Sequence, residues 1–442
     1  MRKYLTFLIA LIIISACTVL PGLKPTPARE AGEVEIPTPV AGNTPTSKQP
    51  SPEPQASPVG KAAPPFASLR MFTADTGWAV GASPEAADQI FRTIDGGYSW
   101  AYAGPAQEEA IPEGYRAHAF FLDSERAWVT YYPSNASALG PSSVWHTADG
   151  GVSWTPGFTP HKDQNVPDYA FEALFFTDAL NGWLMLAHSP GAGNAPVSLF
   201  HSEDAGVHWV TLLNPFQGQA DRLHTCCRAG MLFLDALNGL VAYGGGPYTS
   251  PMVHVSRDGG YSWNSQELPP ADEEVFSRAA CGSGPISSLG ENRLALAVAC
   301  FDSERPAPIA IPYLYLSEDA GMSWRGAPLP DELVQSAPLS RLRREYRLQF
   351  IDTQYGWFFV QDEDWDQGDP PAVRTHIYQS QDGGLTWVEK AEVDWIGEFS
   401  FIDPMNGWAI TRLGNNLGLL RTHDGGGTWQ PLNPVVPLER PN

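Results

Sequence analysis

The chain has 442 residues and a formal net charge of −22, and it contains 15 tryptophans, 42 glycines and 41 prolines. A surface that neutralises phosphates needs clustered Lys and Arg, so this charge argues against a nucleic-acid partner. The abundance of Gly, Pro and aromatic residues favours short strands joined by tight turns over helices.

The N-terminus, MRKYLTFLIALIIISACTVLPG, has the parts of a secretory signal peptide: a cationic start, an apolar run over residues 5–14, and small residues after it. The ending Ile14-Ser15-Ala16-Cys17 resembles the bacterial lipobox, which implies that residues 1–17 are a lipoprotein signal peptide and that Cys17 is lipidated. We therefore expect an extracytoplasmic protein, at the cell surface or in the periplasm, held on a bacterial membrane by lipid on Cys17. The alternative is a soluble secreted protein with an incidental cysteine.

Residues 18–65 are rich in Pro, Thr, Ser, Ala and Glu and have almost no large apolar side chains. Such a segment cannot bury enough surface to offset its ordering entropy, and its prolines keep it extended. We predict a disordered tether that holds a folded body off the membrane.

Two short motifs alternate from residue 66 onward. The first, Phe-x-Asp-x-x-x-Gly-Trp and close variants, begins at Phe72, Phe121, Phe176, Phe233, Phe350 and Phe401, with a degenerate copy at residues 286–294. The second, Asp-x-Gly-x-Ser/Thr-Trp, joins Asp95 to Trp100, Asp149 to Trp154, Asp204 to Trp209, Asp258 to Trp263, Asp319 to Trp324, Asp382 to Trp387, and Asp424 to Trp429. Repeats of roughly forty to sixty residues suit propeller blades.

Each unit is interpreted as four short antiparallel strands. The first motif makes the turn between strands one and two, and the second makes the turn between strands three and four. In the second turn Asp accepts backbone hydrogen bonds, Gly takes a positive φ, and Trp packs between neighbouring sheets. The sequence therefore predicts an all-β, seven-bladed β-propeller over residues 66–434, followed by a C-terminal tail over 435–442.

The second motif resembles the Asp-box, or bacterial neuraminidase repeat. Its pairing with the first motif resembles the photosystem II stability/assembly factor family, whose members are seven-bladed propellers. The resemblance covers residues 66–434, and it implies a role in the assembly or stabilisation of a membrane complex.

If both motif turns lie on one face, the variable connections lie on the other face, where we expect binding. On the predicted inner strands, Arg116 and Arg228 stand five residues before Phe121 and Phe233, and Arg347 stands three before Phe350. These cations are predicted to line one channel. Sialidase activity is disfavoured, because no Tyr/Glu pair can be assigned and sialidases have six blades.

A basic cluster over residues 340–347 contains Arg341, Arg343, Arg344 and Arg347. We interpret it as a docking patch for an acidic or carboxylate-bearing partner, the alternative being a strand edge protected by charge. Residues 362–369, DEDWDQGD, are interpreted as a solvated acidic loop, because the Gly and the closing residue are misplaced for a calcium-binding loop.

An exported protein can form disulfides. Cys281 and Cys300 flank a predicted turn, so we favour a bridge between them, while a bridge from Cys226 to Cys281 between neighbouring blades stays open. Cys227 has no assigned partner. No Cys/His spacing suggests zinc, and we expect neither a metal nor a cofactor.

The sequence favours a monomeric, membrane-anchored propeller that binds a protein or peptide and has no catalytic activity. The alternative is a cell-surface propeller that binds or cleaves carbohydrate, with Tyr131, Tyr132, Tyr248 and Trp365 as loop aromatics for sugar stacking. Xyloglucanase-like hydrolases also resemble this chain in their repeats, but they place the carboxylate pair in a cleft between two propellers, and this chain has one.

Overall fold

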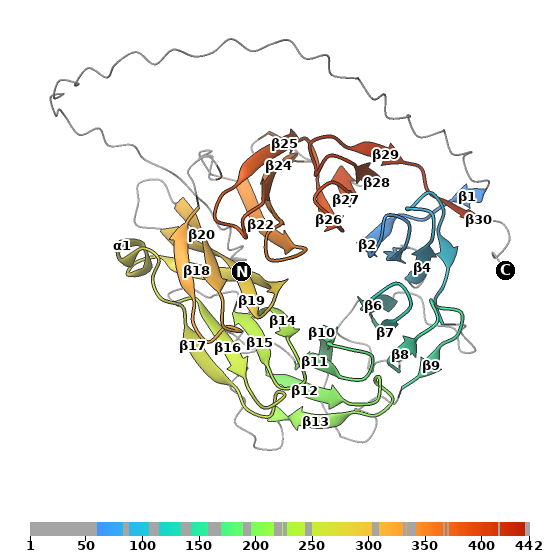
Figure 1. Ribbon diagram of the computed structural model, residues 1–442, viewed down its shortest axis with the longest axis horizontal. Helices are drawn as coiled ribbons and strands as arrows, with labels where there is room; N and C mark the ends of the chain where they lie inside the picture. Colours follow the sequence, from blue (N-terminus) through green and yellow to red (C-terminus); the bar gives the residue numbers. More distant parts are fainter. Residues whose placement is uncertain are drawn as a thin grey trace, which may run out of the picture.

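Seven small sheets stand in a ring in the computed structural model of the protein (Figure 1). The structure describes residues 60–82, 88–105, 115–133, 143–157, 169–188, 196–215, 223, 228–243, 250–302, 309–329, 333, 342–365, 367–368, 371–413 and 416–437. Each sheet has four consecutive strands in chain order, and neighbouring strands pair antiparallel. The predicted all-β, seven-bladed propeller is confirmed.

We number the blades 1 to 7 in chain order. Blade 1 consists of β2 (Phe66–Met71), β3 (Gly77–Gly81), β4 (Gln89–Thr93) and β5 (Ala101–Tyr102). Blade 2 consists of β6 (Tyr115–Phe121), β7 (Ala127–Pro133), β8 (Trp145–Thr147) and β9 (Thr155–Pro156). Blade 3 consists of β10 (Tyr169–Phe176), β11 (Gly182–His188), β12 (Val197–Ser202) and β13 (Val210–Leu213). Blade 4 consists of β14 (Arg228–Phe233), β15 (Gly239–Tyr243), β16 (Met252–Ser256) and β17 (Asn264–Glu267).

The remaining blades follow the same order. Blade 5 consists of β18 (Ala280–Gly290), β19 (Arg293–Asp302), β20 (Ile309–Ser317) and β21 (Arg325–Pro328). Blade 6 consists of β22 (Leu342–Phe350), β23 (Gly356–Asp364), β24 (Ala372–Ser380) and β25 (Val388–Val393). Blade 7 consists of β26 (Ile396–Phe401), β27 (Gly407–Leu413), β28 (Asn416–Thr422) and β29 (Gln430–Leu432).

The two ends of the folded chain meet beside blade 1. Strand β1 (Gly60–Ala62) pairs antiparallel with β30 (Val435–Pro437), and Val435 also forms a bridge with Ser99 of blade 1. The first strands of neighbouring blades, such as β2 and β26, contact each other, and Figure 1 shows β2, β6, β10, β14 and β26 toward the middle of the ring. Strand β1 lies in the range expected to be tether and β30 in the range expected to be tail, so β-structure reaches beyond residues 66–434 at both ends.

The tryptophan near the start of the second strand packs against the next blade. Trp183 stacks on Phe233 with ring centroids 3.7 Å apart, and its Nε1 donates to the carbonyl of Gly259 at 2.8 Å. The same stacking joins Trp78 to Phe121, Trp128 to Phe176, and Trp357 to Phe401. Each indole is buried with its N–H satisfied, so these residues hold blade to blade.

The glycine before this tryptophan is required by close packing. A Cβ at Gly182 would lie 2.1 Å from the ring of Phe176, the last residue of the preceding strand. In blade 1 the position of that phenylalanine belongs to Met71, which pairs with Gly77. Our alignment of Phe72 with the other phenylalanines is therefore one residue late.

The aspartate of the second motif braces its turn. In blade 4, Oδ1 of Asp258 accepts hydrogen bonds from the backbone N–H of Ser262 at 2.8 Å and from Oγ of Ser256 at 2.9 Å, and Oδ2 accepts from Oγ of Ser262 at 2.6 Å. Gly259 and Gly260 have φ of 76° and 100°, a region that favours glycine. Equivalent bonds recur in all seven blades, with His208 in place of the hydroxyl residue in blade 3.

Both motif turns lie on one face of the ring. In each blade a backbone N–H of the second turn donates to a carbonyl of the first turn, as Gly259 does to Leu237 and Gly425 to Met405, both at 2.9 Å. We call this surface, made by residues 72–76 and 94–99 of blade 1 and their equivalents, the turn face.

These turns make stability depend on pH. In five of the turns partial desolvation raises the pKa of the carboxyl, but hydrogen bonds from the residues around it lower the pKa by more. The pKa therefore lies below the ordinary 3.8 in Asp149, Asp204, Asp258, Asp382 and Asp424. A carboxyl with a lower pKa in the folded state stabilises the fold above the pKa of the unfolded chain, and it loses that contribution as pH falls. Burial lowers the pKa of several histidines, that of His118 to about 4, so stability begins to decline as pH falls below about 6.5. We expect the urea midpoint to fall more steeply below about pH 4, where the turn carboxyls take up protons. Asp258→Asn should weaken this fall, and a midpoint that stays level down to pH 3 would contradict the prediction.

Blade 5 forms although its first motif is degenerate. Glu291 and Asn292, with φ of 52° and 64°, make a two-residue turn between β18 and β19. The short helix α1 (Glu273–Phe276), capped by Asp272, precedes this blade and is the one helix among the described residues. No helix of the described chain has the length and apolar character needed to cross a membrane.

Candidate functional site

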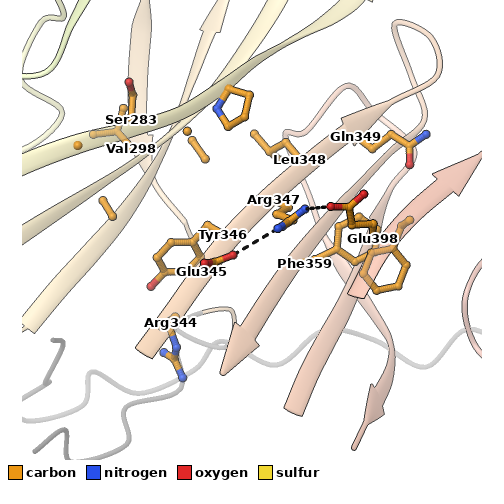
Figure 2. A pocket seen from close by; sticks show the side chains of 16 residues that line it. Ser283, Val298, Arg344, Glu345, Tyr346, Arg347, Leu348, Gln349, Phe359 and Glu398 are labelled. Carbon is orange, nitrogen blue, oxygen red and sulfur yellow. Dashed lines mark hydrogen bonds and ion pairs between the residues drawn. The ribbon is translucent and has the colours of Figure 1, made fainter. Parts of the chain in front are cut away.

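A cavity of about 620 Å³ lies where the inner strands of blades 5, 6 and 7 meet, and we call it the axial cavity. Its walls come from residues 282–285 of β18, 297–299 of β19, 344–349 of β22, Phe359 of β23, and Glu398 and Phe399 of β26. Figure 2 shows these side chains from close by. Three successive blades supply the walls, so the cavity depends on how these blades pack against one another.

Strand β22 divides its side chains between two neighbours, as alternation in a strand requires. Glu345, Arg347 and Gln349 belong to the side facing blade 7, where the amide of Gln349 exchanges hydrogen bonds with the backbone of Phe401 at 3.1 and 3.2 Å. Tyr346 belongs to the other side, and it packs with a cluster that includes Ala297 of blade 5. The strand therefore presents charge to one side of the cavity and an aromatic ring to the other.

Three charged groups meet on the blade 7 side. Nη2 of Arg347 lies 3.4 Å from Oε2 of Glu345, and its Nη1 lies 3.6 Å from Oε1 of Glu398 (Figure 2). The three side chains are between 39% and 44% exposed, so a ligand in solution can reach them. Because one guanidinium contacts both carboxylates, their contacting oxygens are no farther apart than about 9.5 Å, the upper end of the separations found between paired glycosidase carboxyls.

Aromatic and buried polar groups support this charged trio. The rings of Phe359 and Phe399 stack across the boundary of blades 6 and 7, with centroids 3.9 Å apart. Beneath the other side, the guanidinium of Arg344 donates to both carboxylate oxygens of Asp362, at 2.5 and 2.6 Å, and both side chains are buried. Burial lowers the pKa of Arg344, but the hydrogen bonds and charge of Asp362 raise it by more, so the pKa of Arg344 lies above its usual value.

The hydroxyl of Tyr346 stays protonated. Burial raises the pKa of Tyr346 above its usual value, although Arg344 opposes that shift. The hydroxyl oxygen is itself buried, so Tyr346 lines the cavity with its ring and not with its hydroxyl.

The structure places the predicted inner-strand arginines on inner strands and pairs each with a carboxylate of a neighbouring blade. Arg116 contacts Asp88 at 2.9 Å. Arg228 is buried and donates through Nε and, at 2.8 Å, through Nη2 to Glu172. Arg347 contacts Glu398 at 3.6 Å, so each of these three arginines lies beside a carboxylate of the next or preceding blade.

The basic cluster is likewise neutralised over its described part. Arg344 is buried against Asp362 and Arg347 lies between two glutamates, because the strand that carries them packs into the ring. Arg344 and Arg347 therefore both pair with carboxylates of the protein itself. Arg341 and the side chain of Arg343 lie outside the described residues.

Sequence reasoning missed Glu345 and Glu398, although a positional signal existed. Glu345 stands five residues before Phe350, as Arg116 does before Phe121, and Glu398 stands three before Phe401, as Arg347 does before Phe350. Both positions fall on the same side of an inner strand. Examining the positions three and five residues before each of these phenylalanines, for acidic as well as basic residues, would have identified Glu345, Arg347 and Glu398.

Other predicted positions have mixed outcomes. Cys281 and Cys300 form a disulfide between paired positions of β18 and β19. Trp365 is 40% exposed, whereas Tyr131 and Tyr132 are buried in β7, so placing these two tyrosines in exposed loops for sugar stacking was wrong. Asp362 belongs to β23 and bonds Arg344, so the acidic stretch begins inside a strand. Cys17, Cys226, Cys227 and Tyr248 lie outside the described residues, and no cluster of metal-binding side chains occurs among those described.

No protein-family model matches the chain, and neither does the sequence of any curated protein. Its fold is shared with a xyloglucanase. The GH74 xyloglucanase from Xanthomonas campestris superposes with a TM-score of 0.51 and 14% identity, over 86% of this chain and 55% of the xyloglucanase, so this chain spans about half of that protein. An ulvan lyase of polysaccharide lyase family PL25 superposes with a TM-score of 0.47 and 14% identity, over 85% of this chain and 96% of the lyase.

The comparison corrects one prediction. From the sequence we expected a scaffold without catalytic activity, but a protein that shares this fold is a glycoside hydrolase. The non-catalytic assignment is therefore withdrawn. At this identity the similarity shows the fold alone, and the chemistry has to be argued from the cavity.

Proposed function

We propose that the protein is a carbohydrate-active propeller that binds a saccharide in the axial cavity and hydrolyses it with Glu345 and Glu398. The observation that carries this proposal is the pair of solvent-accessible carboxylates on either side of Arg347. The predicted alternative function, a carbohydrate-binding or carbohydrate-cleaving propeller, thus becomes the main one.

The chemistry needs two carboxyl groups at a limited separation. One gives a proton to the leaving glycosidic oxygen, and the other removes a proton from the attacking water or attacks the sugar carbon itself. Water supplies the hydroxyl that ends on the anomeric carbon, and its proton restores the acid. Phe399 offers an apolar wall for the sugar ring, and Arg347 holds both carboxylates and can donate to sugar hydroxyls.

The direct test is a panel of polysaccharides incubated with the full-length protein in detergent. Neutral glucans, xyloglucan, amino-sugar polymers and uronate polymers are assayed for new reducing ends and for loss of chain length. We expect cleavage of at least one neutral or amino-sugar polymer. The chain carries a formal net charge of −22, so uronate polymers are disfavoured. Absence of both cleavage and retardation in affinity electrophoresis across the panel would overturn the proposal.

We further propose that lipid on Cys17 anchors this enzyme on the outer side of a bacterial membrane. Each methylene buried in the bilayer contributes about 0.8 kcal/mol, so more than one acyl chain on this cysteine gives stable anchoring. The resemblance to the photosystem II stability/assembly factor family, with its implied role in a membrane complex, stays a prediction.

Cys17→Ser is expected to move the protein from the membrane fraction to the soluble fraction, because the serine cannot take the thioether-linked lipid. Fractionation followed by immunoblotting measures the change, and Thr18→Ser serves as the control that should stay on the membrane. If Cys17→Ser partitions as the control does, the anchor lies elsewhere.

A further inference from the structure

Every blade exposes a large apolar side chain on the turn face. In the second motif turn these residues, between 59% and 86% exposed, are Ile94, Val152, Tyr261, Met322 and Leu385. Blades 3, 4 and 7 expose such a residue in the first motif turn. These residues are Leu180, Leu237 and Met405, which are between 51% and 58% exposed. We call these eight residues the apolar ring.

Their distribution is not that of scattered surface residues. Among the described residues, the large apolar side chains with comparable exposure outside the ring are Val210, Trp365 and Val388. Single exposed apolar residues are ordinary on soluble proteins. Here eight of the eleven exposed large apolar side chains among the described residues share one face, which is more than scattering predicts. Exposed as they are, the ring side chains contribute little to the fold, whose turns are held by the aspartates and the backbone.

The turn face carries an aspartate of the second motif in every blade. The same backbone hydrogen bond joins the two turns in all seven blades, so each blade presents its ring residues on the same face. The turn aspartates stand among them, and their hydrogen bonds hold the pKa of Asp149, Asp258 and Asp382 below the ordinary value, so these carboxylates are ionised at neutral pH. A bacterial membrane surface that carries anionic lipids repels such a face, while Lys and Arg on a protein complement it.

We propose that the turn face docks a partner protein that presents an apolar surface bordered by Lys and Arg. This surface lies opposite the variable loops, where we expected binding. It is also separate from the axial cavity, so the inference stands whether or not the cavity hydrolyses a saccharide.

A ring variant tests this directly. Val152→Ser, Leu237→Ser, Met322→Ser and Leu385→Ser are combined, and Val210→Ser with Val388→Ser form the matched control. Both variants should unfold at the wild-type temperature, because all the changed side chains are exposed. The probe is a fluorescent amphipathic peptide of Leu and Lys, with a Leu/Glu peptide of the same pattern beside it.

Fluorescence anisotropy should show the Leu/Lys peptide binding the wild type and the control equally and the ring variant at least tenfold more weakly. The affinity should fall as salt is raised, and the Leu/Glu peptide should not bind. Equal binding of the Leu/Lys peptide to the ring variant would overturn the proposal. Ring-dependent flotation of the soluble Cys17→Ser protein with phosphatidylethanolamine–phosphatidylglycerol vesicles would overturn it in favour of a membrane surface.

In cells, a photocrosslinking residue at Val152 should capture a protein whose yield drops when Leu237, Met322 and Leu385 are changed to Ser. The same residue at Val388 should not capture it. Capture at both positions with equal yield, or insensitivity to the three substitutions, would contradict a docking role for the ring.

Discussion

Replacing Trp408 with alanine is expected to lower the free energy of unfolding by about 3 to 5 kcal/mol, as for other large aromatic residues removed from a core. Trp408 is fully buried where blade 7 meets blade 1, in a cluster with Phe66 and Trp100. Its Nε1 donates to the carbonyl of Gly96 at 2.9 Å, and the guanidinium carbon of Arg421 lies 4.7 Å from its ring centroid. Urea unfolding followed by far-UV circular dichroism measures the loss.

Two further variants serve as controls for Trp408→Ala. Trp365→Ala removes a tryptophan that is 40% exposed at the end of β23, and it should change the free energy of unfolding by less than about 1 kcal/mol. Trp408→Phe keeps part of the packing but leaves the Gly96 carbonyl without this donor. Its loss in free energy of unfolding should therefore lie between those of Trp365→Ala and Trp408→Ala. An equally small loss for Trp408→Ala and Trp365→Ala would show that the pairing of β1 with β30 closes the ring without this tryptophan.

The fold could be predicted from the sequence because its determinants are local and repeated. An Asp, a positive-φ glycine and a Trp within six residues specify one turn, and seven copies specify seven blades. Blade 5 shows that single motif positions can be lost. There Leu289 and Leu294 are buried without the Phe and Trp of the other blades, and the hairpin still forms.

The site could not be predicted in the same way, because its contacts cross from blade to blade. Arg347 and Glu398 belong to different sheets, and no local sequence pattern predicts that their side chains are in contact. Residues 340–347 were interpreted as a basic patch because the sequence does not show that Asp362 and Glu398, on neighbouring strands, lie beside Arg344 and Arg347. Tyr131 and Tyr132 were misplaced for a related reason: β7 continues to Pro133, beyond the point where a loop was expected.

Replacing Glu398 with glutamine is expected to reduce hydrolysis of the substrate found in the polysaccharide panel by about 10² to 10⁴-fold, the usual contribution of one acid–base group. Glutamine keeps the size of the side chain and a hydrogen-bonding oxygen for Arg347, but it can neither give nor take the proton that the reaction needs. Glu345→Gln should have an effect of similar size, because the reaction requires both carboxyls. Initial rates of reducing-end release measure both variants.

The matched control is Glu392→Gln, which makes the same change at a half-exposed glutamate paired with Arg374 on the outer strand β25 of blade 6. It should hydrolyse the substrate at the wild-type rate. Each of the three glutamates forms an exposed ion pair worth at most about 1 kcal/mol, so none of the substitutions should unfold the protein. Saccharide binding to Glu398→Gln should persist within a few fold in affinity electrophoresis, because the aromatic wall and Arg347 remain. If the cavity variants hydrolyse as fast as Glu392→Gln, the carboxylate pair is not the catalytic centre, and the reaction must occur elsewhere on the propeller.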